Sequence, residues 1–226
     1  MMRLHPRDEK DVAEAIKAAL SRNESFEIVA GGTRRALGRP IKTDAILDVS
    51  GIAGLVDYEP SELILTARPG TSITSILDLL AQHGQCLAFE PGLEAGATLG
   101  GALAVGDSGS RRPFAGAARD HFLGCTAISG RGEIFKAGGK VVKNVTGYDL
   151  PKLMAGSFGT LAVLSEVTIK VMPRPETTLT IAVEVKDLAT GLAFPVWAWR
   201  SRYGRSAGPA RHRSETAGRA SGPHPR

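Results

Sequence analysis

Two segments of the chain carry apolar residues at the spacing of an amphipathic helix. In residues 8–20 an apolar residue recurs at every fourth position behind an acidic first turn. In residues 71–84 apolar residues recur three and four positions apart, between Thr71, which we expect to cap the helix, and Gly84 at its C-terminal end. Both segments are predicted to be helices that bury one face.

Short apolar runs bounded by glycine or proline predict strands elsewhere. The predicted strands are residues 26–30, 45–50, 62–67, 121–129, 133–136, 161–171 and 178–185. The Gly-Arg-Gly sequence at 130–132 separates two of them and predicts a hairpin. Strands interrupted by only a few helices predict an α+β fold rather than a regularly alternating α/β fold.

Composition divides the chain into a globular part and a basic tail. The 226 residues are 42% hydrophobic and 23% charged, which excludes wholesale disorder. Residues 195–226 contain seven Arg, no Lys and one Glu, which is a net charge of +6. Because the whole chain has a net charge of +5, residues 1–194 carry −1. The tail has no Leu, Ile or Phe and is predicted to be disordered. We interpret it as a non-native end or, as an alternative, a basic arm, and we expect no nucleic acid partner.

Cysteine content and the N-terminus bear on the location of the protein. Cys86 and Cys125 are too few for a disulfide scaffold and form no zinc-binding motif, so we expect no metal site. The first residues contain no apolar stretch of the kind that a signal peptide requires. The expected location is the cytoplasm.

Three glycine-rich segments are the strongest candidates for a binding site. They are residues 30–35, residues 90–103 with Gly-Gly at 100–101, and residues 156–160. Glycine allows the backbone to approach a ligand and to point N–H groups at it, and adjacent Thr, Ser and Arg side chains suit a phosphate. Any one of these segments is best interpreted as a turn, but the presence of three favours a binding site for a phosphate-bearing cofactor. No segment has the Gly-x-Gly-x-x-Gly pattern of a Rossmann fold or the Gly-Lys ending of a Walker A loop at the required spacing.

The chain resembles the FAD-binding domain of the vanillyl-alcohol oxidase and p-cresol methylhydroxylase (PCMH) type. The shared motifs are Gly-Gly-Thr at 31–33, Ala-Thr-Leu-Gly-Gly at 97–101, Arg-Asp-x-x-Leu-Gly at 119–124 and Gly-Ser-x-Gly-Thr-Leu at 156–161. Within that family, residues 110–116 and 140–157 are similar to the smaller FAD-binding subunits of bacterial glycolate oxidases. The resemblance covers about residues 5–190.

The resemblance implies where the cofactor binds. It implies a PCMH-type domain of two small α+β subdomains with FAD between them at residues 1–175, the start of a largely missing C-terminal substrate domain at 176–194, and the tail at 195–226. The residues that match the family's FAD-binding positions are Gly31, Gly32, Thr33, Arg34, Thr98, Gly100, Gly101, Gly156, Ser157, Gly159 and Val163. One departure is at 106–109, where many relatives carry Asn and this chain has Gly-Asp-Ser-Gly.

The resemblance also implies an activity and partners. It implies an FAD-dependent oxidoreductase that oxidises a small 2-hydroxy acid, glycolate to glyoxylate, by hydride transfer to the flavin. It implies a hetero-oligomer with a larger FAD subunit and an iron–sulfur subunit, peripheral on the inner membrane through those subunits. The alternative is a non-catalytic FAD-binding or assembly module that holds a partner oxidase subunit. We assign no catalytic base, because structural roles fit His83, His121, Tyr148 and Asp149 better.

Overall fold

The computed structural model describes residues 2–140, 147–178 and 184–192. The chain divides into two compact units, Met1–Glu176 and Thr177–Arg226, and the elements below all belong to the first. The basic tail and most of the predicted strand at 178–185 lie outside the described residues.

A short parallel sheet forms around one central strand. β1 (Met2–Leu4) and β2 (Phe26–Val29) both pair in parallel with β3 (Ala45–Asp48), which lies between them. The helix α1 (Glu9–Arg22) makes the crossover that parallel strands require. It begins at Asp8, whose carboxylate accepts two backbone N–H groups of the first turn. The predicted helix at 8–20 and strands at 26–30 and 45–50 are therefore confirmed.

A five-stranded antiparallel sheet contains the rest of the long strands. In spatial order they are β4 (Leu55–Glu59), β5 (Ile64–Ala67), β9 (Ala162–Lys170), β7 (Phe122–Ser129) and β8 (Ile134–Gly138). β9 lies in the centre, as its dense run of branched apolar residues favours. Its buried Thr168 shares a 2.9 Å hydrogen bond with Thr66 of β5, which satisfies both hydroxyl groups. The predicted hairpin is the β7–β8 pair.

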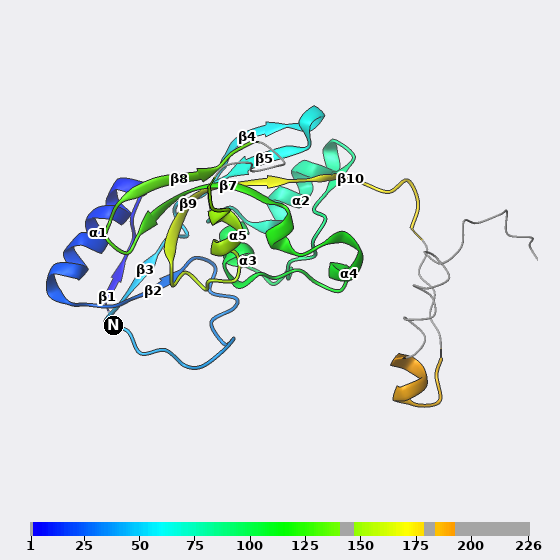
Figure 1. The fold of residues 1–226 in the computed structure, drawn as a ribbon, viewed down its shortest axis with the longest axis horizontal. Coiled ribbons are helices and arrows are strands. Elements are labelled where there is room, and N and C mark those ends of the chain that lie inside the picture. The colour runs from blue at the N-terminus through cyan, green and yellow to red at the C-terminus, as the bar shows by residue number, and fades with distance from the viewer. Residues whose placement is uncertain (1, 141–146, 179–183, 193–226) are drawn as a thin grey trace, which may run out of the picture. The chain divides into compact units, whose positions relative to one another are not determined.

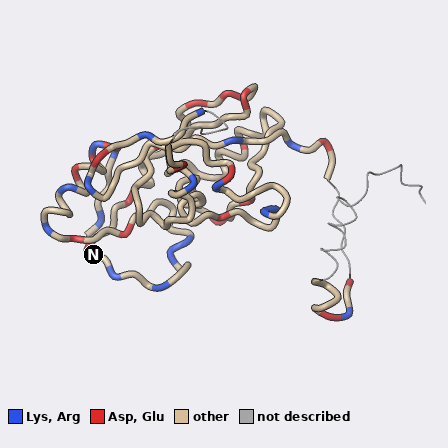
Figure 2. The backbone as a smooth tube through the Cα atoms, viewed as in Figure 1, with Lys and Arg blue, Asp and Glu red and all other residues tan. Residues whose placement is uncertain are grey.

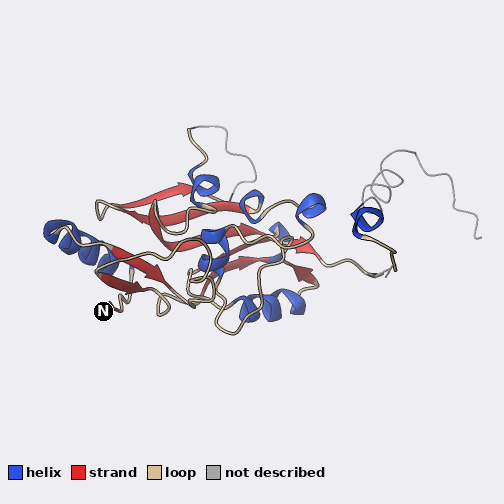
Figure 3. Cartoon of the chain, turned by 90° about the horizontal axis from the view of Figure 1, so that it is seen from below, coloured by secondary structure: helices blue, strands red, loops and turns tan. Residues whose placement is uncertain are grey.

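Short helices surround the two sheets. They are α2 (Ile73–Gln82), α3 (Leu99–Val105), α4 (Arg112–Ala115) and α5 (Leu150–Met154), with 3-10 turns η1 (Pro60–Glu62) and η2 (Ala118–Asp120) and the small antiparallel pair β6 (Gln85–Cys86) and β10 (Met172–Pro173). Within the first unit, α1 and the parallel sheet lie at one end and α2 toward the other (Figure 1), and a view turned by 90° keeps α1 at the same end (Figure 3). In the described part of the chain, no helix has both the length and the apolar character to span a bilayer. The mixed helix and sheet content confirms the α+β fold class.

Three details differ from the sequence predictions. β1 and β4 were not predicted, because both are edge strands with mostly exposed residues and no buried alternation. Thr71 does not cap α2: Ser72 is the N-cap, and its hydroxyl accepts the Ser75 N–H at 3.0 Å. The Thr71 hydroxyl instead bonds both backbone polar groups of Gly54. Gly54 and Thr71 are 17 positions apart in the sequence, so no local sequence pattern indicates this contact.

Two hydrophobic clusters hold the sheets together. The smaller contains Val12 and Ile16 of α1 together with Leu47 of β3, Ile128 of β7 and Val163 of β9. It therefore joins the parallel sheet to the five-stranded sheet. The larger gathers α2, α3 and the inner faces of β5, β7 and β9. The smaller cluster therefore holds the two sheets against each other, and the larger forms the core on one face of the five-stranded sheet.

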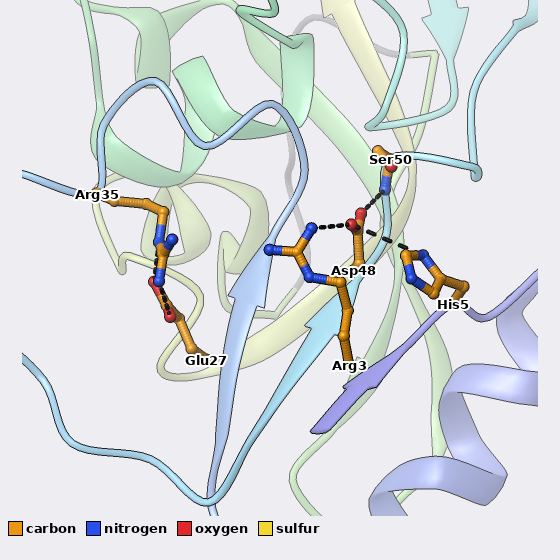
Figure 4. Close-up of polar contacts among 6 residues, drawn as sticks. All are labelled: Arg3, His5, Glu27, Arg35, Asp48 and Ser50. Atoms are coloured by element: carbon orange, nitrogen blue, oxygen red, sulfur yellow. Dashed lines mark hydrogen bonds and ion pairs between the residues drawn. The ribbon is translucent and has the colours of Figure 1, made fainter. Parts of the chain in front are cut away.

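Asp48 is a buried carboxylate at the end of β3. It is 5% exposed, and it accepts hydrogen bonds from Arg3 at 3.1 Å and from the Ser50 backbone at 3.0 Å, with His5 Nδ1 3.7 Å away (Figure 4). Burial raises the pKa of Asp48, but the hydrogen bonds from Ser50 and the charges of His5 and Arg3 together bring that pKa below its ordinary value. The ionised form is therefore favoured in the folded state.

Asp48→Ala is expected to lower the free energy of unfolding by about 1–3 kcal/mol at neutral pH, because the hydrogen bonds that Arg3 and the Ser50 N–H donate to the charged Asp48 carboxylate are lost. The carboxylate has a depressed folded pKa, so its stabilisation is present above the ordinary pKa of 3.8 and is lost as pH falls through the folded pKa. Urea unfolding of both proteins at neutral pH and below pH about 3.5 measures this, and the difference should shrink at the lower pH. Asp78→Ala, at an exposed position of α2, is the control. A constant difference at both pH values would contradict the account.

The two cysteines are expected to differ in reactivity. Cys125 lies buried in β7, and burial raises the pKa of its thiol to about 11, whereas Cys86 in β6 is only half-buried. A thiol reagent at pH about 8 should label one thiol of the native protein rapidly and the second only after denaturation. Cys86→Ser should remove the rapid phase. Two rapid thiols in the native protein would contradict the buried position of Cys125.

Candidate functional site

A cavity of about 290 Å³ lies between the parallel sheet and the five-stranded sheet. Its walls come from β2 and the segment after it, from α3, from the end of α5, and from the start of β9. Glycine and apolar residues make up most of the lining, with Thr, Ser and Arg side chains among them. Such a mixture is typical of ligand pockets, in which a few polar groups orient a mainly apolar ligand.

Ten of the eleven sequence-predicted cofactor residues line this one cavity. They are Gly31, Gly32, Thr33, Arg34, Thr98, Gly100, Gly101, Ser157, Gly159 and Val163. The eleventh, Gly156, does not line it, and its backbone N–H donates to the Leu103 carbonyl of α3 at 3.0 Å. The three glycine segments, separated by more than 120 residues of sequence, thus converge on one space.

The first glycine segment leaves no room for a side chain at Gly31. A Cβ on Gly31 would overlap the backbone carbonyl of Gly96, so the two segments pass in direct backbone contact. Gly32 has φ +70°, a left-handed conformation that glycine adopts without strain. Both residues are exposed at the cavity, so the backbone itself forms this wall.

The second glycine segment ends in a helix, α3, where the sequence predicted only a loop. Thr98 is the N-cap of α3, and its hydroxyl accepts the Gly101 N–H at 3.2 Å. A Cβ on Gly100 would overlap Pro69, so this glycine allows α3 to pack closely against the segment before α2. The low helix propensity of the glycines concealed α3 in the sequence. Burial of Leu99 and Leu103 stabilises it in the folded chain.

Three of the four residues at 156–159, in the third glycine segment, have a left-handed backbone conformation. Gly156 has φ +81°, Phe158 +55° and Gly159 +73°. A left-handed conformation costs a non-glycine residue such as Phe158 roughly 1–2 kcal/mol. The Phe158 backbone is held there by a 2.8 Å hydrogen bond to the Ala104 carbonyl. The segment therefore presents a half-exposed aromatic ring to the cavity, a residue that the sequence analysis did not select.

Arg34 is held by two carboxylates. Its guanidinium bonds Glu94 at 2.5 Å and Asp107 at 2.6 Å, and hydrogen bonding by these two groups raises the pKa of Arg34. The same Asp107 oxygen accepts the Gly92 N–H at 2.9 Å, and a Cβ on Gly92 would overlap the guanidinium. Arg34 thus joins the first glycine segment to two other segments, and its charge is already neutralised by protein groups.

The segment after β2 carries further basic residues, spaced along residues 34–42 (Figure 2). Arg35 makes two 2.7 Å bonds to the Glu27 carboxylate of β2 (Figure 4). Arg39 lines the cavity and, among the described residues, has no ion pair. Among the described basic residues that line the cavity, Arg39 is therefore the one that remains available to a phosphate, and the sequence pattern alone did not distinguish it.

The remaining single-residue candidates have structural roles. His83 ends α2, and its ring lies edge-on to the Tyr58 ring with centroids 5.2 Å apart. Asp149 caps α5. His121 is 9% exposed, and its Nε2 lies 2.7 Å from the Ala115 carbonyl. Neither these residues nor the exposed Tyr148 line the cavity. No catalytic base is therefore assigned among them.

Lys140 and Lys152, two lysines of the motif at residues 140–157, do not line the cavity. Lys140 pairs with Asp57 of β4, and Lys152 pairs with Asp149 at 2.9 Å. Lys143 lies outside the described residues. The phosphate-binding potential of the described site therefore rests on backbone N–H groups and arginine.

Comparison with known proteins connects this geometry to a family. A family model with the description "FAD binding domain" matches residues 2–138. Glycolate oxidase subunit GlcE of Escherichia coli strain K12 is 43% identical over 175 residues, which cover 76% of this chain and 49% of the relative. A D-lactate dehydrogenase of Anaerostipes hadrus is 27% identical over 81% of this chain and 39% of that protein. The chain spans about half the length, or less, of these curated relatives.

A solved structure supports the fold. Alkyldihydroxyacetonephosphate synthase superposes with a TM-score of 0.65 at 20% identity, over 77% of this chain and 32% of that chain. At this identity the likeness concerns the fold alone. The fold of this chain is therefore one that another solved protein shares.

Proposed function

The chain belongs to the FAD binding domain family, and on this premise we propose that it is the FAD-binding part of an oxidoreductase that oxidises a small 2-hydroxy acid. The convergence of ten predicted cofactor residues on one cavity carries the proposal. Glycolate and D-lactate, named in the titles of two relatives, are both small 2-hydroxy acids. This shared chemistry supports the substrate class.

The residues present fit FAD. Backbone contact between Gly31 and Gly96 turns the first glycine segment into a wall without side chains, which a pyrophosphate can approach closely. Thr33 adds a hydroxyl group and Arg39 an unpaired cation in the described lining. Val163 and Ile28 provide an apolar surface for the adenine end. We therefore assign the pyrophosphate to Gly31–Thr33 and Arg39, with Gly156 and Arg34 supporting the surrounding segments.

Bound FAD would supply a two-electron acceptor. Oxidation of a 2-hydroxy acid removes the hydrogen on carbon 2 with its electron pair and, separately, the hydroxyl proton, and leaves a 2-oxo acid. The described residues of this chain orient the cofactor and exclude water from the apolar part of the cavity. We propose that the base for the hydroxyl proton lies outside residues 2–176, since the titratable candidates within that range have structural roles.

We further propose an assembly with other subunits. The name of the Escherichia coli relative describes it as a subunit. The motif resemblance at residues 140–157 implies that the other subunits are a larger FAD subunit and an iron–sulfur subunit. Such an assembly would pass electrons from the substrate to an acceptor. Its proposed location is the cytoplasm or the inner surface of the inner membrane, through the partner subunits.

A non-catalytic FAD-binding or assembly module is the second candidate. The lack of an assigned base among the described cavity residues favours it. In that case the chain would retain FAD and hold a partner, but its flavin would not exchange electrons with a hydroxy acid. The two candidates agree on the cofactor and differ in flavin reduction.

Anaerobic addition of glycolate or D-lactate to the FAD-loaded full chain tests the proposal, with and without the larger FAD subunit. We expect the flavin of this chain to lose its visible absorbance, at the least in the sample that contains the larger FAD subunit. Acetate, which lacks the hydroxyl group, is the control and should leave the spectrum unchanged. A flavin that stays oxidised in every assembly would support the second candidate instead.

A further inference from the structure

A second cavity, of about 450 Å³, adjoins the first. The two share Arg34, Leu37 and Val105 in their linings. Beyond these residues, the second cavity extends along Gly106–Gly109 to Arg112 at the start of α4. Since α3 lines the first cavity and ends at Val105, one continuous segment leads from one space into the other.

The glycines of this segment keep the second cavity open on one side. Gly106 and Gly109 have φ +71° and +70°, so the chain curls without side chains there. A Cβ on Gly109 would overlap Glu90, which shows how closely the segment packs on its outer side. The lining of the second cavity combines these two glycines with apolar and hydroxyl side chains and with four charged side chains.

Arg34 pairs with both carboxylates of the lining, so these three side chains together keep a net charge of −1. Arg34 bonds both Glu94 and Asp107, and hydrogen bonding by Arg34 lowers the pKa of Glu94. Arg112, the fourth, has no ion pair within the part of the chain that the structure describes. Its five N–H donors in a planar fork match a carboxylate, which an arginine binds through two parallel hydrogen bonds.

With FAD bound as proposed above, this arginine would lie beside the flavin end of the cofactor. If adenine lies at Val163 and the pyrophosphate at Gly31–Thr33, the flavin extends from the first cavity toward Arg34 and Val105, where the second cavity begins. This step rests on the proposed function. A substrate must meet the flavin end, and the second cavity is the described space adjoining that end.

We infer that the second cavity binds the carboxylate of the small acid substrate and that Arg112 is its ligand. Arg34 is not the carboxylate ligand, since its guanidinium already bonds Glu94 and Asp107 in the same lining. The assignment gives this chain a direct part in substrate recognition. It does not require the chain to provide the base.

Calorimetric titration of the FAD-loaded full chain with oxalate tests the inference. Oxalate is a two-carbon carboxylate without a hydrogen to lose, so binding is measured without turnover. Arg112→Gln should weaken oxalate binding by about 10- to 100-fold, as expected for the loss of a charge-assisted pair. The oxalate affinity of Arg112→Lys should lie between those of the wild type and Arg112→Gln. Arg111→Gln is the matched control, because its exposed side chain is adjacent in sequence but lines neither cavity.

The FAD content of each variant is measured in parallel. Unchanged FAD content with weaker oxalate binding in Arg112→Gln alone would support the inference. Equal oxalate affinity in wild type and Arg112→Gln, or no oxalate binding to the FAD-loaded wild type, would overturn it without affecting the cofactor assignment. Loss of FAD from Arg112→Gln would also overturn it, by assigning the arginine to the cofactor. A wild-type chain that holds no FAD would instead contradict the proposed function.

Discussion

Gly31→Ala is expected to weaken FAD binding by at least about 100-fold, the largest functional effect of any single substitution considered for this chain. A methyl group at this position overlaps the Gly96 carbonyl, and the overlap is relieved only if the two segments separate. Separation displaces the backbone wall to which we assign the pyrophosphate. The measurement is fluorescence titration of the apoprotein with FAD.

Gly130→Ala is the matched control for this substitution. Gly130 lies in the turn between β7 and β8, where an added Cβ meets open space, so FAD affinity should not change. Gly32→Ala is a second variant that should keep the fold, since its neighbours leave room and only the φ of +70° opposes it. It should weaken FAD binding by about fivefold, because roughly 1 kcal/mol of backbone strain favours another conformation of this segment in the apoprotein. Wild-type affinity in Gly31→Ala would contradict the assignment of this segment to the cofactor.

Phe122→Ala is expected to cause the largest loss of stability, about 3–5 kcal/mol in the free energy of unfolding. Phe122 begins β7, is 1% exposed, and belongs to the larger hydrophobic cluster. Its removal leaves a cavity between the five-stranded sheet and the helices that pack on it. For a domain whose total stability is about 5–15 kcal/mol, this loss is a large fraction.

Urea unfolding followed by circular dichroism measures this effect. Phe114→Ala in α4 is the control, since the Phe114 side chain is 63% exposed and its truncation should change the stability by less than about 0.5 kcal/mol. Equal stabilities of Phe122→Ala and Phe114→Ala would contradict the position of β7 in the core.

The sequence predicted those elements whose pattern follows from burial. α1 and β9 were recognised because one is amphipathic and the other is buried along most of its length. β1 and β4 were missed because an exposed edge strand has no need of apolar alternation. α3 was missed because glycine has a low helix propensity, which Leu99, Leu103 and the Thr98 cap overcome only in the folded protein.

The candidate site, like the fold, could be predicted only in part from the sequence. The glycine segments were recognisable as binding loops from their composition, and the family resemblance identified the ligand. The contacts that shape the site join residues far apart in sequence, such as Arg34 with Asp107 and Gly31 with Gly96. Local sequence carries no signal for such pairs. The ion pairing of Arg34, and the unpaired state of Arg39 and Arg112 in the described lining, therefore required the structure.

The amount of FAD bound by the purified full chain tests the central claim most directly. The visible absorption spectrum is recorded first, and the released cofactor is then identified and counted after denaturation. The account predicts the absorption bands of oxidised flavin and one FAD, rather than FMN, per chain. A protein that unfolds cooperatively, and is therefore folded, but neither carries FAD nor takes it up when it is added would contradict the account.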